Sequence, residues 1–276
     1  MNMFANHDYH IHTNLSSCCK DPTQTPDTIL EYAVKNGYDS VCLTDHLWDS
    51  AVPGASKWYE PQNIEHVRKS LPFPKKDGIK VYFGCETEFC GGNKLGLARE
   101  NFDLFDFVQI PINHMHMKGF VRPADVVSVE QMVQLIPQRL EELLELDLPW
   151  EKVGIPHLTT RHMFSEGDME SLLMGLDESR MMRIFDICAK RRIGIELNAS
   201  CFEPRKDNPE IWPWKENPAA WLRLYKMAKK AGCLFYCGSD SHSSNRFEMN
   251  TIKQYLTEVV EALELTENDR YIIKAV

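Results

Sequence analysis

The sequence lacks the apolar run of roughly 20 residues that a membrane-spanning helix requires. Residues 1–6 carry neither the basic nor the apolar segment of a secretory signal peptide, and the nine cysteines include no Cys-x-x-Cys pair. Basic side chains are in the minority, with 31 Lys and Arg against 40 Asp and Glu and a net charge of −9. We therefore expect a soluble, reduced, cytoplasmic protein with no membrane partner, and the acidic balance argues against a non-specific nucleic-acid binder.

The chain also lacks a linker, because no segment rich in Gly, Ser and Pro divides it. Apolar segments typical of buried strands alternate with amphipathic segments typical of helices. Strands are expected at residues 8–13, 40–44, 79–83, 107–112, 152–156, 194–198 and 234–237. Helices are expected at residues 27–36, 61–71, 128–147, 178–191, 218–232 and 251–265. This alternation predicts an α/β fold with a parallel sheet, and a barrel of about 250 residues would fill residues 1–276 as a single domain.

Histidines and carboxylates gather where the expected strands end. His10 and His12 close the first strand, and Asp240 and His242 follow the last one. Within each pair the residues are two apart, so their side chains point the same way on a strand. The ends of intermediate strands carry one such residue each: His46, Glu86, His114 and His157. Because the carboxyl ends of barrel strands meet at one rim, we expect these imidazoles and carboxylates to form a site for Zn, Mn or Fe(II).

A single histidine after a strand is more often a loop or capping residue than a metal ligand. The repeated spacing and the shared placement favour ligation for the residues at the strand ends. His7, His66 and His162 have no such placement, so we expect them at the surface. The role of His116 stays open, because it stands two residues after His114.

The motifs that contain these residues are HIHT, LTDH, GCE, INH, IPH and SDSH, in that order. Together they resemble the PHP family (polymerase and histidinol phosphatase), and the resemblance spans nearly the whole chain. It implies a distorted (β/α)7 TIM-like barrel that holds two or three divalent ions and hydrolyses phosphate esters. The chain length and the lack of further domains resemble the stand-alone histidinol-phosphatase branch.

The resemblance also implies how the ligands divide among three ions. The first ion would be held by His10, His12, Glu86 and Asp240. The second would be held by Glu86, His114 and His157. The third would be held by His46 and His242, together with a residue shortly after the first motif that is usually His or Asp. Cys18 stands near that position here, Asp21 is a second candidate, and a small buried cysteine is the alternative reading of Cys18.

Such a cluster of ions lowers the pKa of a bound water towards about 7 and clamps phosphate oxygens. We expect a hydroxide that bridges two ions near Glu86 to attack phosphorus, with Asp240 orienting it. Either His242 or a metal-bound water would protonate the leaving group. Arg161 and, by resemblance, Arg205 are candidates for binding the phosphate, since a guanidinium matches its geometry, although many loop arginines are only solvated.

The loop after the second expected strand is long and aromatic, with Trp48, Trp58 and Tyr59. Long loops at a barrel mouth often carry function. These side chains would either form a wall of the site that binds the leaving group or pack over the barrel edge, and the sequence leaves both interpretations open.

Three functions are compatible with these residues. The first is a phosphatase acting on a small-molecule phosphate ester, with histidinol phosphate as the leading substrate. The second is a phosphodiesterase or nuclease on the same metal site, and the third is a non-catalytic, metal-stabilised scaffold that binds a ligand. A long nucleic-acid substrate is disfavoured, because the basic runs fall on expected helices or turns away from the rim: Lys75 and Lys76, Lys190 to Arg192, and Lys229 and Lys230.

Overall fold

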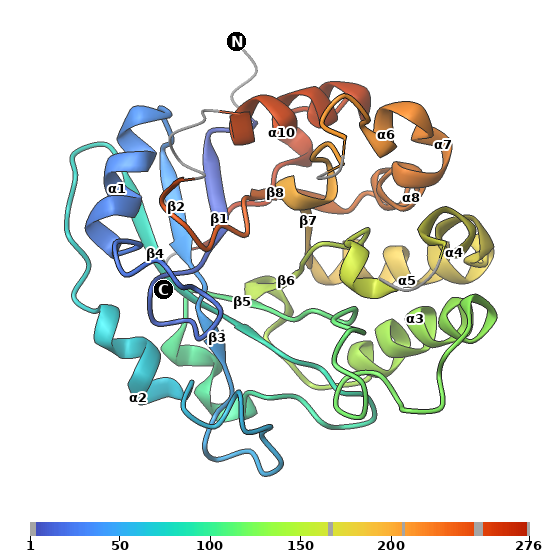
Figure 1. Ribbon diagram of the computed structural model, residues 1–276, viewed down its shortest axis with the longest axis horizontal. Coiled ribbons are helices and arrows are strands. Elements are labelled where there is room, and N and C mark those ends of the chain that lie inside the picture. The colour runs from blue at the N-terminus through green and yellow to red at the C-terminus, as the bar shows by residue number, and fades with distance from the viewer. Residues whose placement is uncertain (1–3, 165–167, 206–207, 246–250, 275–276) are drawn as a thin grey trace.

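The computed structural model describes residues 4–164, 168–205, 208–245 and 251–274. Its strands form a parallel sheet in the order β1-β2-β4-β5-β6-β7-β8, and a short strand β3 also pairs with β4 (Figure 1). The strands are β1 (His7–Ile11), β2 (Ser40–Leu43), β3 (His46–Leu47), β4 (Lys80–Thr87), β5 (Phe107–Gln109), β6 (Val153–Ile155), β7 (Gly194–Asn198) and β8 (Leu234–Gly238). The fold is the expected TIM-like (β/α) barrel.

The first and last strands of the sheet come together and close the barrel. The Asp240 N–H donates to the His10 carbonyl at 2.7 Å, and the His12 N–H donates to the Ser241 carbonyl at 3.1 Å. A parallel bridge also joins Ile11 to Ser241. Closure therefore brings the motif at the end of β1 next to the motif after β8, although they lie far apart in the chain.

The short strand β3 was not expected from the sequence. β2 and β3 pair with successive parts of β4, so together they form one broken strand of the barrel. The break falls at Thr44 and Asp45. The Asp45 carboxylate there accepts hydrogen bonds from the Thr13 N–H and the Ser16 hydroxyl, both at 2.7 Å. This contact between residues distant in sequence explains why the apolar pattern alone did not reveal the break.

The helices lie outside the ring of strands (Figure 1). They are α1 (Pro26–Lys35), α2 (Ile64–Val67), α3 (Val129–Leu144), α4 (Met169–Gly175), α5 (Glu178–Arg191), α6 (Pro213–Glu216), α7 (Pro218–Trp221), α8 (Arg223–Lys230) and α10 (Thr251–Ala262). Short 3₁₀ turns occupy Arg68–Ser70, Arg99–Leu104, Trp150–Lys152, Arg161–Met163, Ala199–Cys201 and Glu267–Asp269. No helix in the described ranges combines the length and the apolar character needed to cross a membrane.

Local signals start several of these helices. Thr25 caps α1 with its hydroxyl, and Pro26 takes the first helical position, where a missing N–H costs nothing. Ser128 and Gln131 form a reciprocal capping box at α3. The sequence did not predict the short helices α4 and α6, and it joined α7 and α8, which are separated at Leu222.

Aromatic side chains fill the interior of the barrel. The Tyr9 ring lies 6.3 Å from Phe107 and 6.4 Å from Tyr236, and the Gln109 amide donates to the Tyr9 carbonyl at 2.8 Å. Because β1 and β5 are not neighbours in the sheet, these contacts cross the interior. A Cβ at Gly154 would lie 2.4 Å from the Phe107 ring and 2.6 Å from the Tyr236 hydroxyl oxygen, so only glycine fits there. The interior is therefore a packed core rather than a pore.

The expectation that His7 lies at the surface is wrong, because its side chain is fully buried in β1. Its Nε2 accepts the Cys237 N–H at 2.9 Å. Burial, and then the charge of Arg270, hold the pKa of His7 well below its usual value. His7 is therefore neutral in the folded protein at neutral pH.

This burial makes stability depend on pH. Below about pH 6.5 His7 takes up a proton in the unfolded chain but not in the folded one. The free energy of unfolding therefore falls as the pH falls, by about 1.4 kcal/mol per pH unit. We expect His7→Gln, which keeps an acceptor for the Cys237 N–H, to flatten this dependence. Urea titrations at pH 7.5 and pH 5.5 measure the free energy of unfolding. Between the higher and the lower pH, the wild type is expected to lose about 1.4 kcal/mol more of this free energy than the variant. Equal losses would show that His7 does not govern the dependence.

Candidate metal centre

Glu86, near the end of β4, lies at the centre of a group of histidines and is only 1% exposed. Its Oε1 is 3.0 Å from His157 Nε2, and its Oε2 is 3.1 Å from His46 Nδ1. Three other Nε2 atoms lie 3.4, 3.6 and 3.8 Å from a Glu86 oxygen, those of His12, His10 and His114. The barrel therefore brings side chains from four other strand ends to one carboxylate.

Three overlapping sets of donor atoms each fit within 4.8 Å. They are His10, His12 and Glu86; Glu86, His114 and His157; and His12, His46 and His242. Asp240 adjoins the first set, with its Oδ1 3.3 Å from His12 Nε2 and 3.5 Å from His10 Nε2. The third set contains His12 in place of Cys18.

Acceptors at Nδ1 orient His10, in β1, and His12, just after it. The His10 Nδ1 lies 2.7 Å from Glu196 Oε1, and the His12 Nδ1 lies 3.0 Å from the Ser16 hydroxyl. Since Ser16 donates its own proton to Asp45, its oxygen accepts from His12. Both Nδ1 atoms are thereby tied to an acceptor, and the two Nε2 atoms turn into the site, where they lie 3.1 Å apart.

The same arrangement recurs on the other side of the site. The His157 Nδ1 donates to Asn113 Oδ1 at 3.0 Å, and the His114 Nδ1 donates to the Glu88 carboxylate. The His242 Nδ1 donates to the backbone carbonyl of Asp240 at 2.9 Å. In each case the bond at Nδ1 leaves Nε2 as the nitrogen that can bind a cation, which it does in its unprotonated form.

His46 differs from the other histidines. Its buried Nδ1 makes no hydrogen bond, although Glu86 Oε2 lies 3.1 Å away. Burial holds the pKa of His46 well below its usual value, so its ring is neutral at pH 7 and one of its two nitrogens has a free lone pair. A buried lone pair without a donor is costly unless a cation or a proton donor satisfies it. The donor set therefore fits divalent metal ions.

The charges in the site oppose the effect of burial. Burial alone would raise the pKa of Glu86, but the imidazoles of His10 and His46 outweigh it and hold that pKa well below the usual range. Burial alone would lower the pKa of His10, yet Glu196, Asp240 and Glu86 raise it well above the usual value. Glu86 thus stays ionised and contributes buried negative charge that a cation would neutralise.

Two residues at the site have left-handed backbone conformations. His157 has a φ of 34° and Asp240 a φ of 52°. Both lie two residues after the end of a strand, and such conformations in non-glycine residues are costly and cluster at functional sites. Their N–H groups are held, since His157 donates to Glu196 Oε2 and Asp240 to the His10 carbonyl, each at 2.7 Å.

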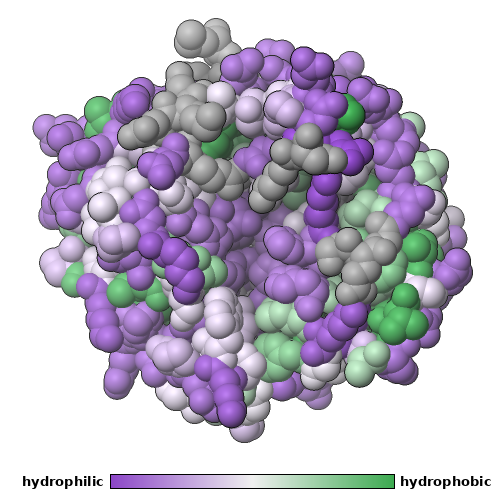
Figure 2. All heavy atoms as spheres, viewed as in Figure 1, coloured by the Kyte–Doolittle hydropathy of each residue, from purple (hydrophilic) through white to green (hydrophobic). Residues whose placement is uncertain are grey.

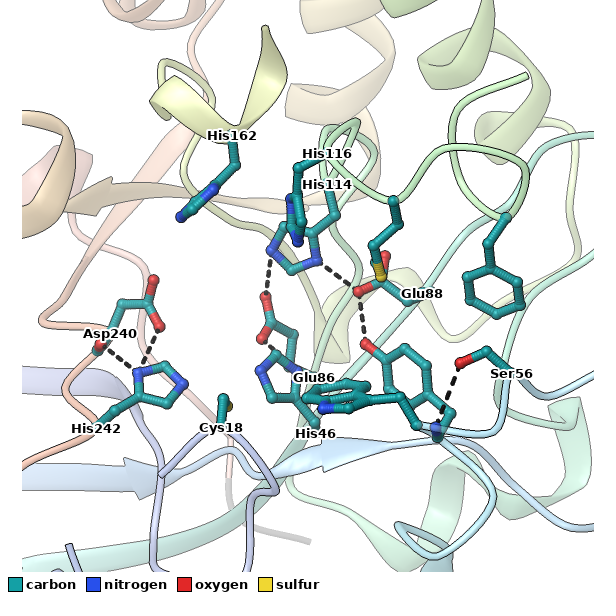
Figure 3. A pocket seen from close by; sticks show the side chains of 14 residues that line it. Cys18, His46, Ser56, Glu86, Glu88, His114, His116, His162, Asp240 and His242 are labelled. Atoms are coloured by element: carbon teal, nitrogen blue, oxygen red, sulfur yellow. Dashed lines mark hydrogen bonds and ion pairs between the residues drawn. The ribbon is translucent and has the colours of Figure 1, made fainter. Parts of the chain in front are cut away.

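The site opens into a cavity of about 640 Å³, which forms part of the hollow in the centre of the face in Figure 2. Its lining comprises Cys18, His46, Ser56, Trp58, Tyr59, Glu86, Glu88, His114, His116, Met117, Phe120, His162, Asp240 and His242. Figure 3 shows Cys18 between His242 and His46, and His116 and His162 on the opposite side. His162, expected as a surface residue without a role, is exposed at this wall, and His116 joins it.

The other candidate residues lie further from Glu86. Arg161 lines an adjoining cavity of about 510 Å³ that it shares with Asp240 and His242. Arg205 lines a different neighbouring cavity, of about 480 Å³, together with Arg161. Asp21 does not line the main cavity, because its carboxylate accepts hydrogen bonds from Thr23 and Ser244 and ties two loops together.

Sequence reasoning missed the residues that orient the histidines. Glu196 is fully buried in β7 and contacts His10, the His157 N–H and, at 3.0 Å, the Asn198 amide. Glu88 is fully buried two residues after Glu86. The available signal was an acidic residue inside an otherwise apolar strand, because such a group is seldom buried without a partner.

We expect Glu196→Ala to weaken metal binding by about 10- to 100-fold, because it removes the acceptor that fixes the His10 ring. Competition of the purified protein with a chromophoric zinc chelator measures this affinity. Glu264→Ala is the control, since this side chain is 90% exposed. Equal zinc affinities in the two variants would contradict the positioning role of Glu196.

A family model described as the PHP domain matches residues 8–200 of the chain. Histidinol phosphate phosphatase from Lactococcus lactis subsp. lactis Il1403, whose crystal structure contains Zn, L-histidinol and phosphate, has a similar fold. It gives a TM-score of 0.54 at 15% identity, over 93% of each chain. PsfC from Pseudomonas syringae PB-5123 gives a TM-score of 0.40 at 13% identity, over 86% of this chain and 76% of its own. No curated protein sequence matches the chain.

Proposed function

The chain belongs to the PHP domain family, and on that premise we propose that it is a metal-dependent phosphatase that hydrolyses a small-molecule phosphate monoester. Histidinol phosphate is the first substrate to test. One observation carries the proposal: imidazoles whose Nδ1 is tied to an acceptor turn their Nε2 towards the buried carboxylate of Glu86. An arrangement of this kind suits cations, and phosphate esters are anions that such cations attract.

We assign the first ion to His10, His12, Glu86 and Asp240, and the second to Glu86, His114 and His157. When bound, divalent ions activate a water as a nucleophile at neutral pH and neutralise the phosphate oxygens. Glu86 supplies negative charge to both positions from the centre of the site. Asp240, whose side chain is 22% exposed, reaches the cavity from the opposite side and would orient the attacking water.

His242 is better suited to hold an ion than to donate a proton. Its ring stacks on His12 with centroids 4.1 Å apart, and burial and then His12 lower its pKa to about 4. It is therefore neutral at pH 7. Arg161 shares a cavity with Asp240 and His242, so we assign it to the phosphate. Arg205 would contact the substrate only from the neighbouring cavity, which it lines together with Arg161.

The test of the function uses protein stripped with a chelator and reloaded with Mn or Zn. Histidinol phosphate, an aryl phosphate and a dinucleotide are supplied in parallel, and phosphate release or diester cleavage is measured. We expect metal-dependent release from at least one monoester. Cleavage of the diester alone would favour a phosphodiesterase, and no metal-dependent cleavage of any compound would favour a non-catalytic scaffold.

We further propose that Cys18 joins His46 and His242 at a third ion. Burial raises the pKa of the Cys18 thiol to about 12, so it is a neutral thiol until an ion displaces its proton. Thiolate is a good ligand for zinc. We expect Cys18→Ser to lower the zinc content by up to one ion per chain in elemental analysis at limiting free zinc.

Cys19→Ser is the matched control, because the Cys19 thiol donates to the carbonyls of His242 and Asp21. Its zinc content is expected to equal that of the wild type. Equal zinc contents in the Cys18 and Cys19 variants would leave His12, His46 and His242 as the third set.

A further inference from the structure

The cavity beside Glu86 has a second wall that the metal centre does not use. It is formed by Trp58 and Tyr59, which lie between β3 and α2, and by Met117 and Phe120, which lie between β5 and α3. We call these four residues the aromatic lobe. The Trp58 ring stands edge-on to the His46 ring, with centroids 5.1 Å apart, so the lobe begins directly at the metal centre.

The aromatic lobe is supported from behind. Tyr59 is fully buried, and its hydroxyl donates to Glu88 Oε1 at 2.6 Å. Trp48 is 1% exposed and packs against both Tyr59 and Phe120, at centroid distances of 5.8 and 5.2 Å. This packing answers the question left open by the sequence, since Trp48 supports the wall and does not line the cavity. The lobe is therefore preformed.

Trp58 differs from its neighbours because it is 38% exposed. Its ring meets Tyr59 at 89° with a centroid distance of 4.7 Å, which leaves part of its surface open to the cavity. A partly exposed aromatic ring in a concave site is typical of small-molecule recognition, because it offers apolar area at little cost in side-chain entropy.

The charge of the cavity limits what the aromatic lobe can bind. The charged side chains that line it, apart from histidines, are Glu86, Glu88 and Asp240, all acidic. Among the described residues that line it there is no Lys or Arg. A second anionic group against the aromatic lobe would therefore find no Lys or Arg to pair with. A neutral or cationic ring meets no such penalty.

We infer that the aromatic lobe binds the leaving group of the phosphate ester, and that this group carries a planar apolar ring without negative charge. The phosphate would lie beside the ions that Glu86 would hold and the ring against Trp58, an assignment that rests on the proposed function. The cavity of about 640 Å³ lies within the range of roughly 300–1,000 Å³ typical of small-molecule sites.

Binding of non-hydrolysable phosphonates to the metal-loaded protein tests this inference without turnover. Isothermal titration calorimetry would compare 2-phenylethylphosphonate, ethylphosphonate and 3-carboxypropylphosphonate. We expect the phenyl compound to bind at least about tenfold more tightly than the ethyl compound, which corresponds to about 1.4 kcal/mol. The carboxylate compound is expected to bind no better than the ethyl compound.

Variants test whether Trp58 is responsible for the tighter binding of the phenyl compound. In Trp58→Ala the ratio of phenyl to ethyl affinity is expected to fall to within about threefold, and Trp58→Phe should keep most of it. Trp150→Ala is the matched control, because Trp150 lies just before β6, at the opposite end of the barrel. A phenyl compound that binds no more than twofold better than ethylphosphonate in the wild type would overturn the inference and leave the proposed function standing. If neither phosphonate binds, the proposed function fails and the aromatic lobe loses its role.

Discussion

Glu86→Gln is expected to lower kcat for phosphate release by on the order of 10³ and to reduce the number of ions bound per chain. Glu86 is shared by two of the three donor sets, so its charge contributes to two sites at once. Glutamine keeps the shape of the side chain but removes that charge from a buried position surrounded by imidazoles. Elemental analysis and steady-state kinetics on the same preparation measure both effects.

Glu65→Gln is the control for this substitution, because Glu65 is an exposed carboxylate on α2. It should match the wild type in rate and in metal content. A Glu86→Gln protein that keeps its ions and loses less than tenfold in rate would remove Glu86 from the centre of the proposed site.

His114→Ala is expected to have a narrower effect than Glu86→Gln. His114 belongs only to the set with Glu86 and His157, so one ion per chain should be lost while the others stay. We expect the rate to fall by about 10²-fold or more, since charge neutralisation at one of two adjoining positions is removed. The Glu88 carboxylate would also lose a buried partner.

His66→Ala serves as the comparison, because His66 is half-buried outside the cavity and contacts the Leu15 carbonyl at 2.8 Å. Metal titration followed by rate measurement at each loading separates the two sites. Retention of a full complement of ions by His114→Ala would show that our second set is assigned wrongly. An unchanged rate after loss of one ion would show that this ion is not needed for turnover.

The sequence predicted the fold because the signals for it are local. The expected strand at residues 194–198 and helix at 178–191 coincide with β7 and α5. Buried apolar runs define strands of a parallel sheet, and Thr25 and Ser128 mark helix starts through their own side chains. The elements that were missed, such as β3 and α4, are short and depend on contacts with other parts of the chain.

The order of motifs and the rule that strand ends share one rim were enough to gather the candidate ligands into one hypothesis. The PHP resemblance drawn from those motifs is confirmed by the family match over residues 8–200. Periodicity could not assign a partner to Glu196, because its contact with His10 spans 186 residues. The sequence pattern did not predict the burial of His7 for the same reason, since its partner Cys237 is 230 residues away.

By itself the sequence determined the alternation of strands and helices, the placement of His10, Glu86 and Asp240 at strand ends, and the family. Those features depend on residue types and on their spacing, both of which can be read directly from the sequence. Only the tertiary structure decided which nitrogen of each imidazole faces the site, because that depends on acceptors brought in by closure of the barrel. It also decided that Trp58 lines the cavity while Trp48 supports it from behind, because side chains on one loop diverge according to what packs against them.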